Sequence, residues 1–210
     1  PSYMSVTYGA NSGERDRTHD VVKRIQAETG IQAVPHLTCV DATREELIEI
    51  AKDYWQSGIR KIVALRGDTP KAAEHFVPTV GGLRYANELV ELIHQQYSHF
   101  GVAVAGYPEV HREAPSAEDD LINLKRKVDA GADIIITQLF YMNDDFFRFC
   151  DRCRGIGIQV PIVAGLLPVI SLKQIQRIAG LCGARLPQSF IDRLSKHEDP
   201  QWQFQVGVEQ

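Results

Sequence analysis

The 210-residue chain lacks long apolar runs, a targeting segment and any excess of positive charge. No run approaches the roughly 18–20 apolar residues of a membrane-spanning helix, and no signal-peptide pattern is present. A formal net charge of −4 argues against a broad nucleic-acid-binding surface. We therefore expect a cytoplasmic protein that acts on small molecules.

Cysteine is also scarce, with four residues that do not resemble a secreted disulfide framework. Cys39 and Cys182 lie in apolar contexts, whereas Cys150 and Cys153 form a C-x-x-C pattern inside an expected helix at 144–154. A zinc site would need a second pair of ligands at suitable spacing, and none is apparent. The pair is interpreted as structural, with a metal or redox role as the alternative.

What the chain does contain is six short apolar runs, each ending in a compact polar cluster. Stretches with helical periodicity separate the runs, which is typical of parallel strands joined by helical crossovers. The carboxyl ends of such strands converge on one mouth, where ligands bind. The runs span residues 3–6, 33–35, 61–65, 102–106, 133–136 and 161–164.

Capping patterns predict where several helices begin. The residues between 68 and 82 carry prolines and glycines and are expected to form a loop at the site. The patterns are Thr43-x-x-Glu46, Ser116-x-x-Asp119 and Ser171-x-x-Gln174, and the chain from Asp199 onward indicates one more helix start.

Six such units suit either a doubly wound sheet or a (β/α)8 barrel. The turn after the first run lacks the G-x-G-x-x-G pattern of a doubly wound nucleotide-binding fold. Distinctive residues follow nearly every strand, which favours the α/β class with a (β/α)8 TIM barrel. A barrel needs eight units, so we expect residues 1–210 to form one partial catalytic barrel domain. About one unit is expected before Pro1 and the rest after Gln210, in a longer protein.

Four polar residues recur along one face of an expected helix, at i, i+3, i+6 and i+7. A plain solvated face would show the same pattern. Alternatively, the carboxylate and the amide would bind sugar hydroxyls, and the two cations would bind a diphosphate. The four residues are Asp120, Asn123, Arg126 and Lys127.

Arg66-Gly67-Asp68 follows the third run. Gly67 would let a flat ligand approach the backbone, and Asp68 could accept a ligand N–H or shift a nearby pKa. An ordinary turn with an ion pair explains the same residues.

Aromatic, imidazole and amide groups follow other runs. Tyr107 and His111 lie four residues apart after the fourth run, and His36 follows the second. Each histidine alone is more often structural than catalytic. Gln138 follows four apolar residues, and a buried amide there would need partners from a ligand or a neighbouring strand.

Taken in order, these segments resemble those of the methylenetetrahydrofolate reductase family over nearly the whole chain. The stretch from Asn11 to Thr18 resembles the bacterial branch. The matching segments are Ser5-Val6-Thr7-Tyr8-Gly9, Pro35-His36-Leu37-Thr38-Cys39, Ala64-Leu65-Arg66-Gly67-Asp68, Gly106-Tyr107-Pro108-Glu109-Val110-His111, the run from Asn123 to Ala132, and Ile136-Thr137-Gln138-Leu139-Phe140.

The resemblance implies a (β/α)8 barrel that holds FAD at the carboxyl ends of its strands. It implies hydride transfer from NADH or NADPH to FAD and then to 5,10-methylenetetrahydrofolate, in a ping-pong sequence that yields 5-methyltetrahydrofolate for methionine biosynthesis. A homo-oligomer is expected as well.

The resemblance also implies site residues. Asp68 is the catalytic carboxylate, which holds the pterin and tunes the flavin potential. Thr7, Gln138 and Phe146 lie near the nicotinamide or folate, and Ile178 stands where some members carry an aromatic residue. The cofactor-binding positions are Tyr8, Ala10, His36, Arg66, Gly67, Asp68, Tyr85, Ala86, Tyr107, His111, Asp120, Asn123, Arg126 and Lys127.

The chemistry requires one more group, because the folate ring must open to an iminium and its N10 must be protonated by a positioned acid. In the family this acid is a Glu on the first barrel strand, which is expected to precede this chain. The alternatives are therefore a catalytically incomplete barrel fragment that binds flavin weakly or not at all, and a pterin-handling methyltransferase barrel without flavin. The polar stripe from Asp120 to Lys127 argues against the methyltransferase.

Overall fold

The computed structural model describes residues 1–7, 12–68 and 76–210. Two compact units are present, and some helices and strands contribute to both. Unit 1 comprises Pro1–Ala105 with Arg126–Ile135, and unit 2 comprises Gly106–Lys125 with Ile136–Gln210.

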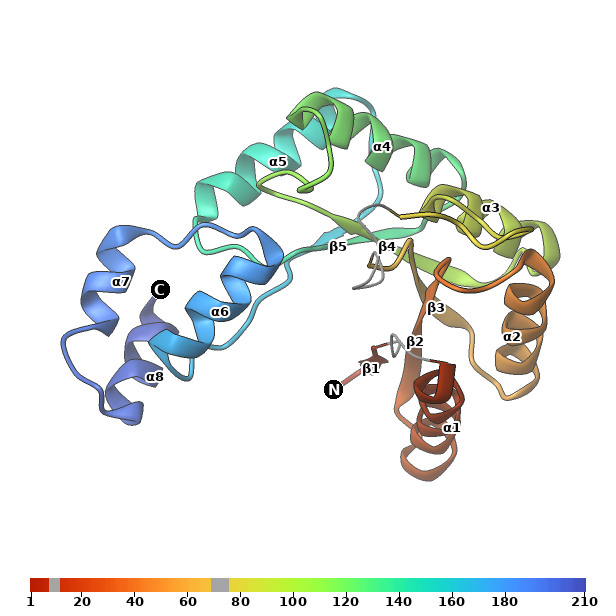
Figure 1. Cartoon of the computed structure of the whole chain (residues 1–210), viewed down its shortest axis with the longest axis horizontal. Coiled ribbons are helices and arrows are strands. Elements are labelled where there is room, and N and C mark those ends of the chain that lie inside the picture. The colour runs from red at the N-terminus through yellow and green to blue at the C-terminus, as the bar shows by residue number, and fades with distance from the viewer. Residues whose placement is uncertain (8–11, 69–75) are drawn as a thin grey trace. The chain divides into compact units, whose positions relative to one another are not determined.

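Strands and helices alternate along the chain. In the described residues, six strands follow one another in sheet order from β1 to β6. The colours of Figure 1 let the alternation of strands and helices be followed from the N-terminus. The registers of β1 to β4 are parallel. These are the β-α units of part of a (β/α)8 barrel, so the expected fold class is confirmed. The strands are β1 (Tyr3–Val6), β2 (Gln32–Thr38), β3 (Lys61–Leu65), β4 (Gly101–Gly106), β5 (Ile134–Thr137) and β6 (Ile162–Val163).

In the part of the chain that the structure describes, each of the first five strands is followed by one helix, and three helices follow the sixth. The helices are α1 (Ser12–Thr29), α2 (Arg44–Gln56), α3 (Ala86–Gln96), α4 (Ala117–Asp129), α5 (Asn143–Gly155), α6 (Leu172–Cys182), α7 (Gln188–Leu194) and α8 (Pro200–Glu209).

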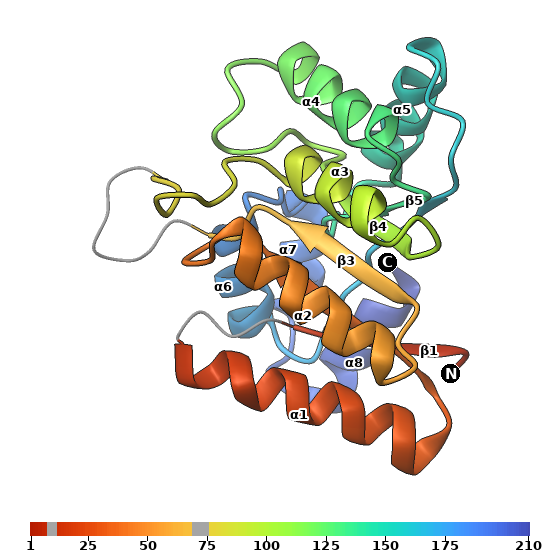
Figure 2. The ribbon, with the colours of Figure 1, turned by 90° about the vertical axis from the view of Figure 1, so that its right-hand side faces the viewer.

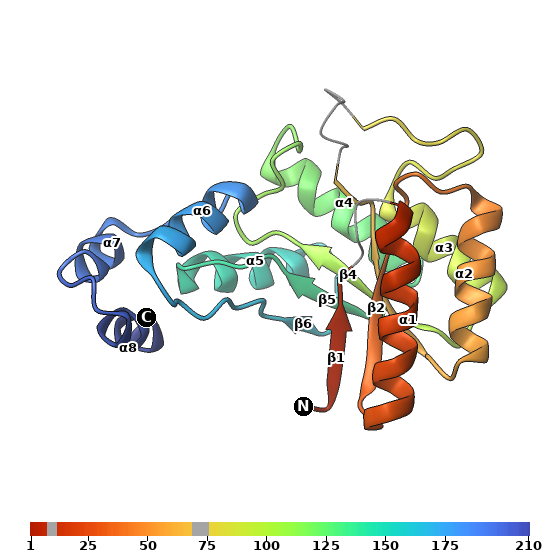
Figure 3. The same cartoon turned by 60° about the horizontal axis from the view of Figure 1, so that its bottom comes forward.

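The core of unit 1 lies between its strands and the helices that cover them. Leu37, Ile62 and Val102 come from three neighbouring strands and are fully buried. In Figure 2, α2 and α3 lie beside β3. Helix α3 contacts α2 and also contacts β3. In Figure 3, α1 runs along β2, which it also contacts. The parallel strands of this unit therefore have one helix-covered face, and their carboxyl ends share one edge.

Unit 2 has a hydrophobic core of its own. Phe190 and Leu194 of α7 are fully buried against Ile175 of α6 and Val206 of α8. The buried amide of Gln203 satisfies its polar atoms, since its oxygen accepts from the Leu172 N–H at 2.9 Å and its nitrogen donates to backbone carbonyls. This cluster fixes the three helices that follow β6.

The predicted helix starts are confirmed. Thr43 and Glu46 form a complete capping box at α2. Ser171 accepts from the Gln174 N–H at 3.2 Å, and Asp199 accepts from the Trp202 N–H at 2.8 Å. The structure adds α7, which the sequence did not predict.

One strand runs further than predicted. The second apolar run was expected to end at Pro35, but β2 continues to Thr38, so His36 lies inside the strand rather than after it. At this point the pairing passes from β1 to β3, because Val6 is opposite Pro35 and His36 is opposite Val63. Proline lacks an N–H, which a change of partner tolerates.

Candidate functional site

Thr7 and His36 each follow a paired residue of unit 1, because Val6 of β1 is opposite Pro35 of β2. From His36 onward β2 pairs with β3, and His36 is opposite Val63. Thr7 is exposed and His36 is partly buried. Burial lowers the pKa of His36, because the imidazolium form loses solvation. His36 can therefore donate or accept a hydrogen bond as a neutral ring.

The Arg66-Gly67-Asp68 turn packs tightly against the end of β2. Gly67 has φ +90°, and a Cβ there would clash with Val40 Cγ2. The backbone N–H of Cys39 donates to the Arg66 carbonyl at 3.0 Å. The fold itself therefore requires glycine at position 67, both for the positive φ and because no space is left beside its backbone for a Cβ. The exposed carboxylate of Asp68 follows it directly.

Arg66 belongs to the same turn and is partly buried. Its Nε donates to the Gly67 carbonyl at 3.2 Å, and its guanidinium carbon lies 5.0 Å from the centre of the Phe76 ring. A cation held over a ring keeps its position with little loss of solvation. The turn thus presents a cation and a carboxylate two residues apart.

Tyr85 and Ala86 mark the start of α3. Tyr85 occupies the N-cap position and is 52% exposed. Its carbonyl lies 3.6 Å from the buried Cys39 Sγ, which ties the start of α3 to the end of β2. Tyr85 therefore presents an exposed aromatic side chain in the same unit as His36 and Asp68.

Helix α4 carries the predicted polar stripe. At 100° per residue, its four members fall within about 120° of the helix circumference. Acidic residues fill the first turn, and Arg126 and Lys127 fill the last, which complements the helix dipole. The stripe therefore has a structural role as well as ligand-binding potential. Asn123 and Arg126 are exposed, while Asp120 and Lys127 are partly buried.

Lys127 already has an intramolecular partner. Its Nζ donates to the Ala105 carbonyl of β4 at 2.5 Å. This contact brings the ammonium group to the carboxyl end of β4 within unit 1. A phosphate oxygen could join the same ammonium, which has three donor hydrogens.

The loop after β4 is organised around Tyr107 and His111 in unit 2. Their rings meet edge to face with centroids 4.7 Å apart. The His111 backbone N–H donates to Asp120 Oδ2 at 3.0 Å, and His111 Nδ1 accepts from the Glu113 N–H at 3.1 Å. The structure thus brings together three predicted site residues, Tyr107, His111 and Asp120.

Gln138 follows β5 in the same unit. Its backbone N–H donates to the Gly106 carbonyl at 2.8 Å, and its side-chain oxygen accepts from the Leu139 N–H at 2.9 Å. The partners that the amide oxygen needs are therefore supplied locally. Phe146 stacks on Phe140 with centroids 5.0 Å apart, so the protein already covers one face of the Phe146 ring.

A small pocket in unit 2 combines two predicted residues with one that the sequence analysis did not select. Glu109 lines it, its side chain is 11% exposed, and its Oε1 is buried without a hydrogen-bond partner. Burial raises the pKa of Glu109. In the sequence, the feature that could have indicated this buried charge is the position of a carboxylate between Pro108 and Val110. The pocket is lined by Tyr107, Pro108, Glu109, Val110, Gln138, Leu139, Cys182, Gly183 and Ala184.

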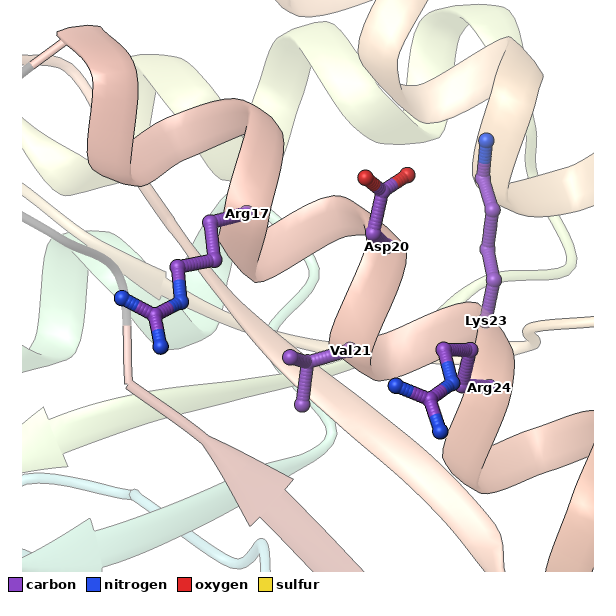
Figure 4. A pocket seen from close by; sticks show the side chains of 5 residues that line it. All are labelled: Arg17, Asp20, Val21, Lys23 and Arg24. Atoms are coloured by element: carbon purple, nitrogen blue, oxygen red, sulfur yellow. The ribbon is translucent and has the colours of Figure 1, made fainter.

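A second hollow lies on the surface of α1 and includes none of the predicted residues. In Figure 4, Arg17, Val21 and Arg24 project from one side of the helix, and Asp20 and Lys23 from another. Two of the three cations are already paired, Lys23 with Asp53 at 2.6 Å and Arg24 with Glu28 at 2.9 Å. This hollow is a weak candidate for an anion site.

The C-x-x-C pair lies on α5, as predicted. Cys153 is fully buried, and burial raises its pKa to about 11, so it stays a thiol at neutral pH. Among the residues whose side chains the structure describes, 1–7, 17–68 and 76–210, no cluster of three or more His, Cys, Asp or Glu side chains could hold a metal ion. No helix in these ranges is long and apolar enough to cross a membrane.

A family model described as methylenetetrahydrofolate reductase matches residues 1–210. The chain belongs to this family. It is 52% identical over 211 residues to the 5,10-methylenetetrahydrofolate reductase of Pectobacterium carotovorum subsp. carotovorum, covering 99% of this chain and 68% of that protein. It is 54% identical over 187 residues to that of Salmonella typhimurium, covering 89% of this chain and 61% of that protein. The chain thus spans about two thirds of the length of these relatives.

Solved structures share the fold at low identity. A Clostridium thermocellum protein, described as binding two copies of 5-methyl-5,6,7,8-tetrahydrofolic acid, aligns with a TM-score of 0.59 at 11% identity. The alignment covers 99% of this chain and 80% of that chain. A phosphoenolpyruvate phosphomutase from Streptomyces platensis subsp. rosaceus aligns with a TM-score of 0.51 at 13% identity, over 71% of this chain and 52% of that chain.

Family membership confirms the resemblance read from the sequence, while the roles of single residues stay predictions. Tyr8 and Ala10 lie outside the described residues. Ile178 lies on α6 and is partly buried, so an aliphatic side chain occupies that position.

Proposed function

We propose that the protein reduces 5,10-methylenetetrahydrofolate to 5-methyltetrahydrofolate with FAD as cofactor and NADH or NADPH as hydride donor. Family membership over the whole chain supports the reaction class. The Tyr107, His111 and Asp120 cluster is the structural observation that carries the proposal, since it joins aromatic, imidazole and carboxylate groups in one loop and helix.

The donor set of the site fits FAD. Arg126 and Lys127 offer two cations for a diphosphate, Asp120 and Asn123 offer acceptor and amide groups for ribityl hydroxyls, and Tyr107 offers an aromatic surface. FAD, when bound, would accept a hydride from NADH or NADPH and pass it to the folate.

The chain's own residues would hold the cofactor by three kinds of contact. The guanidinium of Arg126 would bind phosphate oxygens bidentately. The ammonium of Lys127 would add a point charge while it keeps its bond to the Ala105 carbonyl. The neutral His36 imidazole would hydrogen-bond a polar ring edge without adding charge.

Asp68 would act on the substrate side. The exposed carboxylate of Asp68 follows Gly67, whose backbone packs closely against Val40, and it would accept N–H donors of a pterin. Its negative charge would also disfavour further negative charge nearby, and so influence the cofactor's potential. Thr7 and Gln138 would position the nicotinamide or folate.

Two measurements test this proposal. Flavin absorbance near about 450 nm, a property of the cofactor itself, would separate the reductase from a flavin-free methyltransferase barrel. Oxidation of NADH with a quinone acceptor and reduction of the folate are then assayed separately. Activity in both supports the proposal. Flavin binding with no folate reduction supports the incomplete barrel fragment, and no flavin binding by the folded chain contradicts the proposal.

A further inference from the structure

Glu109 lines the pocket of unit 2 but has no role in the proposed function. It lies in loop 107–112, between the residues of the Tyr107 and His111 ring pair. Its Oε2 accepts two hydrogen bonds from Arg185, from the backbone N–H at 2.9 Å and from Nε at 3.4 Å. Its Oε1 is buried and makes none.

Arg185 continues the contact to a second acid. Its Nη2 donates to Asp145 Oδ2 at 2.6 Å, and Arg148 pairs with the other oxygen of Asp145. The side chains of Glu109 and Asp145 are 11% and 6% exposed, whereas that of Arg185 is 62% exposed. One guanidinium thus links loop 107–112 to the first turn of α5, with both carboxylates shielded from water.

A second link joins the same loop to the end of α6. Arg112 donates to the Leu181 carbonyl at 3.0 Å and to the Gly180 carbonyl at 2.6 Å. These carbonyls belong to the last turn of the helix, where a cation is favourable. Gly183 ends the helix at φ +78°, and a Cβ there would come within 3.0 Å of Arg112 Nε. The loop is therefore held from both ends of the 109–112 segment.

We propose that Glu109 is a positioning residue that, through Arg185, holds loop 107–112 in the conformation that receives the flavin. The inference rests on the proposed flavin-binding function. Burying a carboxylate is costly unless it is paired. The raised pKa of Glu109, caused first by its burial and opposed by Arg185, reports this cost. In return, the contact with Arg185 fixes the loop that carries the Tyr107 and His111 rings, which flank Glu109 in the chain.

Three variants and one control test the proposal. Glu109→Gln keeps the shape and removes the charge, Arg185→Met removes the guanidinium, and the double variant measures their coupling. Arg193→Met is the control, because Arg193 forms an ion pair with Glu209 elsewhere in unit 2 at 2.6 Å, the same distance as the Arg185 to Asp145 pair.

The first readout is backbone hydrogen exchange of residues 107–112 without added ligand. We expect faster exchange in both single variants and none of this change in the control. The second readout is the dissociation constant of FAD, measured by flavin fluorescence. We expect this constant to increase about three- to tenfold in each single variant. In the double variant it should be no more than about twofold above that of the single variant with the weaker FAD binding.

The outcomes distinguish failure of the positioning role of Glu109 from failure of the proposed flavin-binding function. Unchanged exchange in loop 107–112 overturns it, and so does unchanged FAD affinity despite faster exchange, which would make the contact purely structural. If the wild-type chain binds no FAD, the proposed function fails and takes the flavin-positioning role with it. The exchange data alone then decide whether Glu109 and Arg185 hold the loop.

Discussion

The backbone N–H of His111 donates a hydrogen bond to the carboxylate of Asp120 at 3.0 Å. This bond joins the loop after β4 to the first turn of α4, so one carboxylate both shapes the loop and begins the polar stripe of the helix. Asp120 therefore couples the aromatic and the charged parts of the candidate flavin site.

Removing this carboxylate should weaken flavin binding. We expect Asp120→Ala to raise the FAD dissociation constant about tenfold or more, because the loop loses its anchor and the ribityl chain loses an acceptor. Glu118→Ala, which removes a carboxylate from the same helix turn, is the control and should stay within about twofold. Equal effects of the two substitutions would show a general charge effect instead.

The cation of the stripe is tested separately. Arg126→Ala should lower FAD retention during gel filtration and raise its dissociation constant by about one to two orders of magnitude, as expected for loss of a charge-assisted phosphate contact. The matched control is Lys125→Ala on the neighbouring face of α4. Unchanged FAD affinity in Arg126→Ala would show that this helix does not bind the diphosphate.

Asp68 should matter more for one half-reaction than for the other. Asp68→Asn is expected to slow folate reduction far more than NADH oxidation, because the pterin loses its carboxylate partner while the nicotinamide does not. Stopped-flow measurement of each half-reaction checks this, with Asp53→Asn on α2 as the control. Equal losses in both half-reactions would contradict the role of Asp68.

Gly67 gives a prediction that is independent of any ligand. Gly67→Ala should destabilise the protein by roughly 2–4 kcal/mol, because the new Cβ clashes with Val40 Cγ2 in addition to the strain of φ +90°. Gly58 has φ +82° and open space where a Cβ would lie, so Gly58→Ala isolates the conformational cost at about 1 kcal/mol. Urea denaturation compares the two, and equal losses would exclude the contact with Val40.

Cys39 predicts a pH dependence of stability. Burial raises its pKa from 9.0 to about 12, so the thiolate forms more readily in the unfolded chain. Its contribution to stability is complete below pH 9 and is lost as the pH rises from 9 toward about 12. Cys39→Ala should therefore flatten the decline of the free energy of unfolding across this window. An identical decline in the variant would show that Cys39 does not titrate as described.

Local features of this chain were predictable from the sequence. The capping box of Thr43 and Glu46 lies within three residues, and it forms as expected because neighbours in sequence are neighbours in space. Pro35 was misleading, because the end of β2 depends on its pairing with β3, a segment nearly thirty residues away in the registers. Strand ends set by long-range pairing are not visible in local patterns.

The site shows the same division. The stripe on α4 follows from helical spacing. The turn at 66–68 and the residues His36, Tyr107, His111 and Gln138 follow from their places after the apolar runs, and the family resemblance supplied the remaining positions. The contact of Glu109 with Arg185 joins residues 76 positions apart, so no spacing rule indicates it. The sequence analysis did not predict a buried charge at Glu109, although a carboxylate between Pro108 and Val110 could have indicated one that needs a partner.

The most direct test of the flavin site is titration of the purified chain with FAD, followed by flavin fluorescence and absorbance. We predict saturable binding of one FAD per chain, weakened in Arg126→Ala and Asp120→Ala and retained in Glu118→Ala. A folded chain that binds no FAD, or binds it equally well in all four proteins, would contradict this site.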